Sequence, residues 1–134
     1  MNDIPEGYRL SDFKGTYLKH VGPYCLKPTD TGINVGLRIT KTHINYVDVA
    51  HGGVLTTLAD VALSLQAHRA EEPPLNVTTI SLNTNFLGPA MLGDWLEAEG
   101  QIDRMGKRIC YTSGKIRSGG KIIMTMTGVF NIMR

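Results

Sequence analysis

The stretch that decides the fold is residues 51–67, HGGVLTTLADVALSLQA. Apolar side chains recur there at the spacing of one helix face, at Val54, Leu58, Val61 and Leu65. Residues 54–67 are therefore predicted to form an α-helix. The leucines and alanines between these positions spread the apolar surface almost all the way round, which is typical of a helix enclosed by other elements.

The rest of the chain shows the pattern of β-strands. Alternating and β-branched segments precede the helix at 33–40 and follow it at 77–90, 94–106, 107–120 and 121–133. Glycine and proline mark the breaks between the last four segments, so an antiparallel meander joined by hairpin turns is expected. A sheet that covers such a helix must curl around it. The predicted fold class is α+β, with a curved antiparallel β-sheet wrapped around one long central helix.

Length and composition favour one ordinary domain. The chain has 134 residues, of which 42% are hydrophobic and 19% charged. Residues 1–30 are expected to form an N-terminal extension, with a short helix around 9–15 and a strand-like piece in 16–28. The net charge is only +2, without a concentrated basic face, so no nucleic-acid partner is expected.

Several other classes of protein are not expected. The N-terminus lacks an apolar signal core and no uncharged run reaches membrane-spanning length, so a soluble cytoplasmic protein without a membrane partner is predicted. Cys25 and Cys110 have no metal-ligand spacing and are expected to be reduced thiols. The chain has no GxSxG, Walker or dinucleotide-binding motif. No metal and no other cofactor is expected.

Two glycines stand at the mouth of the predicted helix. The first N–H groups of a helix have no partner within it, and the helix dipole favours negative charge there. Because Gly52 and Gly53 lack side chains, a ligand oxygen can approach these groups closely. Such a site would polarise a carbonyl whose oxygen becomes negative in a transition state. The alternative is that the glycines only permit a tight turn into the helix.

Asp60 is the only charged side chain between Gly52 and Ala67. A carboxylate in an apolar segment is costly unless it is paired or hydrogen-bonded. Its presence indicates a general base or a nucleophile. The alternative is a structural carboxylate buried at a subunit contact.

The spacing of these two features has a consequence for assembly. Gly52 and Asp60 lie eight residues apart, which is about 12 Å along a helix axis. A carbonyl held at Gly52 is therefore out of reach of Asp60 in the same helix. If both act in one reaction, two antiparallel helices of a two-fold dimer would bring each Asp60 to the other subunit's Gly52. A homodimer is expected on this ground.

The motifs together resemble a known family. The pattern N45-x5-H51-G52-G53-x6-A59-D60, followed by T79-I-S-L-N83-x-N-F-L-x-P89-A, is similar to hotdog-fold acyl-CoA thioesterases. The resemblance is to the PaaI-like, phenylacetyl-CoA thioesterase-like branch of the 4-hydroxybenzoyl-CoA thioesterase superfamily. It covers about residues 30–132 and implies one hotdog thioesterase domain over 1–134.

The resemblance implies roles for the residues that match the motif. The Gly52 N–H would polarise the thioester carbonyl, and Asp60 of a second subunit would act as base or nucleophile. Asn45 would hold the substrate or the attacking water, although an Asn in a loop is also a common turn residue. His51 would support the same end of the site or act as a structural cap. Thr79 would position water or the carboxylate, with Thr78 as the alternative if the register differs by one.

Further residues are implied as substrate contacts. Gly53 and Asn83 belong to the matched motif, and Lys107 and Arg108 are candidates for the CoA phosphates. A solvated charged turn is the alternative for the last two. Relatives often have a glycine between the Asn and the HGG, whereas this chain has Asp48 in that loop.

The expected activity is hydrolysis of an acyl-CoA, with an aromatic or medium-chain acyl group, to free acid and CoA. A homodimer that assembles into a dimer of dimers is implied. One alternative is a hotdog hydratase or dehydratase, which would need Asp and His acting together, whereas His51 and Asp60 are about 13 Å apart along the helix. The other alternative is a non-catalytic acyl-CoA-binding protein, which would not need Asp60.

Overall fold

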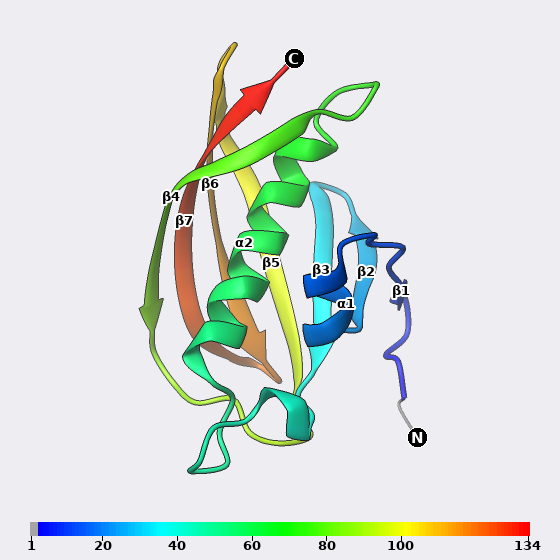
Figure 1. The fold of residues 1–134 in the computed structure, drawn as a ribbon, viewed down its shortest axis with the longest axis vertical. Coiled ribbons are helices and arrows are strands. Elements are labelled where there is room, and N and C mark those ends of the chain that lie inside the picture. Colours follow the sequence, from blue (N-terminus) through cyan, green and yellow to red (C-terminus); the bar gives the residue numbers. More distant parts are fainter. Residues whose placement is uncertain (1–2) are drawn as a thin grey trace.

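The long helix α2 (Gly52–His68) lies against one side of a single curved sheet in the computed structural model, which describes residues 3–134 (Figure 1). The remaining elements are β1 (Arg9–Leu10), α1 (Thr16–Val21), β2 (Tyr24–Thr29), β3 (Gly32–Arg38), the 3-10 turn η1 (Lys41–His43), β4 (Asn76–Phe86), β5 (Trp95–Met105), β6 (Ile109–Ser118) and β7 (Lys121–Met133). The predicted α+β architecture, a curved antiparallel sheet around one central helix, is confirmed.

The seven strands lie in the order β1-β2-β3-β5-β6-β7-β4, and all neighbours are antiparallel. The predicted hairpins β5–β6 and β6–β7 are present. The predicted hairpin between 77–90 and 94–106 is wrong, because β4 pairs with β7 at the far edge of the sheet. The segment between β4 and β5 instead crosses the end of the sheet, where the Ala50 N–H donates to the Ala90 carbonyl at 2.8 Å.

The core lies between α2 and the facing side of the sheet. Fully buried side chains on this side include Leu58 and Leu63 of α2 and Leu96, Ile116 and Phe130 of the strands. Burial of such side chains stabilises the fold by roughly 1.5–3 kcal/mol each. The end of α2 is anchored by the buried Gln66, whose amide donates to the Ile33 carbonyl at 2.7 Å and accepts from the Ile33 N–H at 3.3 Å.

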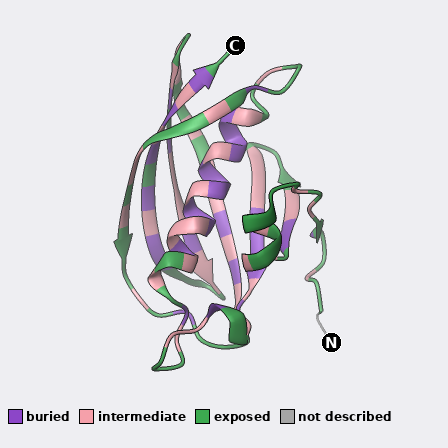
Figure 2. Cartoon of the chain, viewed as in Figure 1, coloured by how far each residue is buried: buried purple, intermediate pink, exposed green. Residues whose placement is uncertain are grey.

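The composition of α2 led us to expect a helix enclosed on every side. Within one protomer this expectation is wrong, because one side of the helix is open. Its buried residues face the sheet, and a stripe on the opposite side remains partly or fully exposed (Figure 2). This open stripe consists of Gly53, Thr57, Asp60, Ser64 and His68. Because these residues are spaced by three or four, they share one helix face. The open stripe therefore presents the only carboxylate of α2 to the surroundings.

The N-terminal segment 11–23 lies beside α2 and is here named the N-terminal arm. The helix expected around 9–15 is wrong in position, since the arm's helix α1 starts at Thr16 and Arg9–Leu10 form a strand. The arm has no fully buried residue in α1 and is largely exposed in Figure 2. It packs on the core through the partly buried Phe13, Leu18 and Val21.

Candidate active site

Asp60 is held in place by a short hydrogen bond from the edge strand. The Thr79 hydroxyl donates to Asp60 Oδ1 at 2.6 Å. Thr79 sits directly before a bulge at Ile80, where the register of β4 against β7 shifts. No other described residue donates to this carboxylate, so Oδ2 is free to accept a proton or attack a carbon. Thr79, rather than Thr78, makes this contact.

A groove of about 480 Å³ begins at Asp60 and follows the open stripe of α2. Its volume lies within the range of small-molecule sites, about 300–1,000 Å³. Residues of the N-terminal arm and of the first half of β4 complete its lining. The lining residues are Phe13, Leu18, Asp60, Val61, Ser64, Leu65, His68, Asn76, Val77, Thr78, Thr79 and Met133. A carboxylate thus stands at the side of a largely apolar groove.

The mouth of α2 is capped by a histidine. His51 is the N-cap residue, and its Nδ1 accepts a hydrogen bond from the Gly53 N–H at 2.8 Å. Because Nδ1 accepts, the neutral ring carries its proton on Nε2. The Gly52 N–H has no acceptor within residues 3–134. The mouth therefore offers one free backbone donor, while the second glycine is used by the cap.

The loop before the helix is shaped by Asn45. Its side-chain Oδ1 accepts from the Val47 and Val49 N–H groups at 3.0 and 3.3 Å. In this protomer Asn45 is therefore a turn residue, and its amide N–H groups have no acceptor within residues 3–134. Asp48 has a φ of 64°, a conformation that favours glycine and that Asp adopts more readily than most residues. This explains why a glycine suits the loop and how Asp48 replaces it.

Gly52 and Asp60 do not meet within one protomer. The helix is regular from Gly52 to His68, so the two residues stay about 12 Å apart along its axis. A Cβ at Gly52 would lie 3.7 Å from the Phe86 ring, which is ordinary van der Waals contact. The protomer itself therefore does not require glycine at position 52.

The other predicted contacts lie away from Asp60 in this protomer. Asn83 is exposed and pairs with Thr127 on the side of the sheet opposite α2. Lys107 and Arg108 are exposed in the β5–β6 turn. This turn lies near the C-terminal end of α2, because Arg134 donates to the Lys107 carbonyl at 3.0 Å and also pairs with Glu71.

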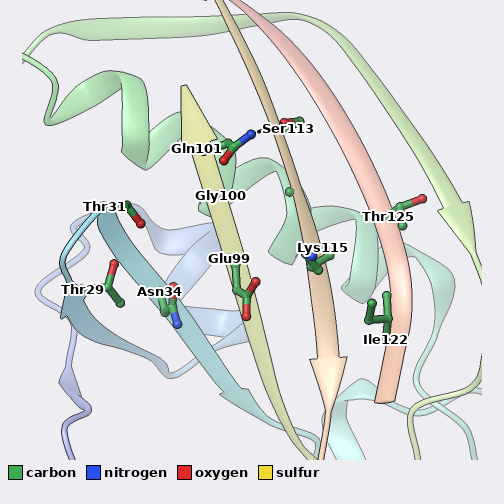
Figure 3. A pocket seen from close by; sticks show the side chains of 11 residues that line it. Thr29, Thr31, Asn34, Glu99, Gly100, Gln101, Ser113, Lys115, Ile122 and Thr125 are labelled. Atoms are coloured by element: carbon green, nitrogen blue, oxygen red, sulfur yellow. Dashed lines mark hydrogen bonds between the residues drawn. The ribbon is translucent and has the colours of Figure 1, made fainter. Parts of the chain in front are cut away.

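A larger pocket, of about 580 Å³, lies on the face of the sheet that points away from α2 (Figure 3). Most of its lining residues carry polar side chains, and one of them, Gln101, donates to Asp103 and Ser113. It contains none of the predicted catalytic residues. We therefore place the chemistry at the smaller groove, where a free carboxylate oxygen and an apolar wall occur together.

Phe13 and Leu18 are among the groove residues that sequence reasoning missed. They lie more than 40 positions before Asp60, and no local period links them to it. The open stripe could have been predicted from the sequence. Its polar residues recur at helical spacing, which indicates one exposed helix face: Thr57, Asp60, Ser64 and His68.

Other chemistries find little support among the described residues. Burial raises the pKa of both the Cys25 and the Cys110 thiol, so these free cysteines stay protonated at neutral pH. Residues 3–134 contain no group of three His, Cys, Asp or Glu side chains placed to hold a metal ion. None of the helices in this part of the chain is long and apolar enough to cross a membrane.

The chain is similar in sequence to a known protein and in fold to several solved structures. A Pseudomonas aeruginosa protein named as a candidate esterase is 35% identical over 98% of this chain and 99% of its own length. The solved structure of a phenylacetic acid degradation protein PaaI mutant from Thermus thermophilus shares the fold, with a TM-score of 0.78 at 22% identity, over 89% of this chain and 100% of that one. A hypothetical thioesterase of Streptococcus pneumoniae, solved with coenzyme A, has a TM-score of 0.75 at 24% identity, over 82% and 88% of the two chains.

The hotdog architecture expected from the motifs is thus confirmed by the solved structures, as is the likeness to PaaI. The family profile of the thioesterase superfamily matches residues 48–124, which include the helix mouth, α2 and β4 to β6. The chain belongs to the thioesterase superfamily.

Proposed function

We propose that the protein hydrolyses acyl-CoA thioesters to free acid and CoA, in a site shared between two subunits. The observation that carries the proposal is the Asp60 carboxylate, held by Thr79 at 2.6 Å with one oxygen free, beside an apolar groove. Membership in the thioesterase superfamily supports the reaction type. The coenzyme A in the Streptococcus pneumoniae neighbour supports the thiol half of the substrate.

Gly52 and Asp60 have different roles in the proposed reaction. The thioester carbonyl accepts a hydrogen bond from the Gly52 N–H of the partner subunit, which stabilises the oxyanion as it forms. In the base route, Asp60 takes a proton from water as the water oxygen attacks the carbonyl carbon. The C–S bond then breaks and the thiolate of CoA takes that proton. In the nucleophile route, Asp60 attacks the carbonyl carbon first, and the C–S bond breaks to release the thiolate of CoA. Water then hydrolyses the resulting anhydride to the free acid and the Asp60 carboxylate, and the proton released from water goes to the thiolate.

The geometry of α2 supports the proposal of a shared site. The free donor at Gly52 and the free oxygen at Asp60 lie on one helix but about 12 Å apart along it. The open stripe is partly exposed in the protomer, and the edge strand β4 carries the exposed apolar side chains of Ile80 and Phe86. An antiparallel dimer across this face would cover them and build two identical sites.

A thiol-release assay over aromatic and aliphatic acyl-CoAs tests the reaction. We expect turnover of at least one member of the panel well above the Asp60→Asn background. If the protein binds acyl-CoA but releases no thiol from any member, it is a binding protein and the proposed hydrolysis is wrong. Label found in Asp60 after a single turnover in ¹⁸O-labelled water would identify the nucleophile route, with water attacking the Asp60 side of the anhydride.

The β5–β6 turn tests the proposed CoA half of the site. Reversing both charges, with Lys107→Glu and Arg108→Glu, is expected to raise KM for acyl-CoA about tenfold, since exposed ion pairs contribute up to about 1 kcal/mol each. A short pantetheine thioester lacks the nucleotide phosphates and should keep its KM. The effect should shrink at high salt, because exposed charges are screened. Equal losses on both substrates would show that the turn only holds the fold.

A further inference from the structure

We propose that the N-terminal arm is the specificity wall of the acyl groove, so that the enzyme takes uncharged apolar acyl groups whose size is limited by Phe13 and Leu18. The inference rests on the proposed function for the reaction, but the groove itself is defined by contacts within one protomer. Both arm residues line the same groove as Asp60.

The arm is fixed to the catalytic helix at the position of the groove. The Tyr17 hydroxyl and Thr57 Oγ1 are 2.8 Å apart. Because the Thr57 hydroxyl already donates to the Gly53 carbonyl at 2.9 Å, Tyr17 is the donor of this bond. Thr57 and Asp60 lie on the same helix face, one turn apart. The arm is therefore tied one turn away from the carboxylate.

The other end of the arm is fixed to the loop that feeds the helix mouth. The buried His43 accepts the Thr40 N–H on Nδ1 at 2.9 Å, so its Nε2 donates to the Val21 carbonyl at 2.6 Å. The His43 carbonyl in turn accepts the His51 N–H at 2.8 Å. These two ties hold Phe13 and Leu18 in register with Asp60.

The lining of the groove decides which acyl groups fit. Its apolar surface comes from Phe13, Leu18, Val61, Leu65, Val77 and Met133. No Lys or Arg side chain lines it among the described residues, and Asp60 is its charged group. His68 has its Nδ1 engaged, because that atom donates to the Leu75 carbonyl at 2.6 Å. An acyl group that carries its own carboxylate would meet no counter-charge and would be repelled by Asp60.

The length of the groove agrees with a limited acyl chain. The groove follows α2 from Asp60 to His68, about 12 Å along the helix axis. Residues of the arm and of β4 also line this path. A larger side chain at position 18 would narrow this path, because Leu18 lines it.

The experiment compares acyl-CoAs of different length and charge on arm variants. For Leu18→Trp, kcat/KM for octanoyl-CoA is expected to fall about tenfold or more while that for acetyl-CoA stays within about twofold. For Phe13→Ala, the preference should move toward dodecanoyl-CoA. In the unmodified enzyme, adipyl-CoA should be a poorer substrate than hexanoyl-CoA by about a hundredfold. His20→Ala, an exposed change on the same helix that lines no part of the groove, is the matched control.

A binding measurement separates this inference from the proposed hydrolysis. Calorimetry with the unreactive thioethers S-octyl-CoA and S-methyl-CoA reports the groove without turnover. Weaker binding of S-octyl-CoA alone by Leu18→Trp supports the arm as the wall, even if no thioester is hydrolysed. The inference would be overturned if the affinities for both thioethers changed equally. It would also be overturned if neither arm variant changed either affinity while its melting temperature showed folded protein. Comparable kcat/KM values for adipyl-CoA and hexanoyl-CoA would contradict the expectation that the groove excludes acyl groups with a carboxylate.

Discussion

Asp60→Asn is expected to lower kcat by at least about 100-fold, because the reaction loses its base or nucleophile. The amide keeps the volume of the carboxylate, and its carbonyl oxygen can still accept the 2.6 Å hydrogen bond from Thr79. KM should therefore change little. Steady-state thiol release, with circular dichroism as a check on folding, measures both effects.

A structural role for Asp60 would give a different result. The melting temperature would fall, and activity would drop only in proportion to the folded fraction. Thr79→Ser keeps the donor and Thr79→Ala removes it, which makes a matched pair. We expect the serine variant to retain most activity and the alanine variant to lose it without a comparable loss of stability. If serine and alanine behave alike, the hydroxyl does not position Asp60.

The second large effect is recovery of activity by mixing two inactive variants. Asp60→Asn removes the carboxylate, and Gly52→Val blocks the approach to the helix mouth. The protomer leaves van der Waals space beside Gly52, so the second variant should fold. A heterodimer has one site with both defects and one with neither. Random exchange of equal amounts should restore about one quarter of the wild-type sites.

The controls for this experiment are subunit exchange and assembly. Differently tagged subunits show that exchange has occurred, and light scattering reports the oligomeric state at the assay concentration. Recovery with exchange would support Asp60 and Gly52 meeting across an interface. Exchange without recovery, or a stable monomer at micromolar concentration, would contradict the shared site.

The sequence predicted the helix and strands of the fold better than it predicted which strands pair in the sheet. The helix expected over 54–67 is observed over Gly52–His68, since the glycines that are weak helix formers are kept in place by the His51 cap. The pairing of Asn76 with Met133 joins residues far apart in the chain. No local period encodes such a contact, so β4 was expected beside β5 instead of at the sheet edge.

The candidate site shows the same division between local and distant contacts. Asp60 was conspicuous because it interrupts an apolar helix, and Thr79 was expected from the motif. The apolar count around the helix suggested full enclosure, but it could not separate side chains facing the sheet from those facing solvent. The place of the arm residues in the groove could not be predicted for another reason, since Phe13 and Leu18 reach it only through tertiary contacts.

The arm's shallow packing has a consequence for how the proposed activity can change over evolutionary time. No residue of α1 is buried, and substitutions at its exposed positions Lys19 and His20 should alter stability by no more than about 0.5 kcal/mol. Asp60, in contrast, stands between the buried Ala59 and Val61 on a helix that the core holds in place. The proposed catalytic residue and the proposed specificity residues therefore lie on parts with very different tolerance to mutation. Descendants of this chain can explore new acyl groups through a short peripheral segment while the reaction centre stays unchanged.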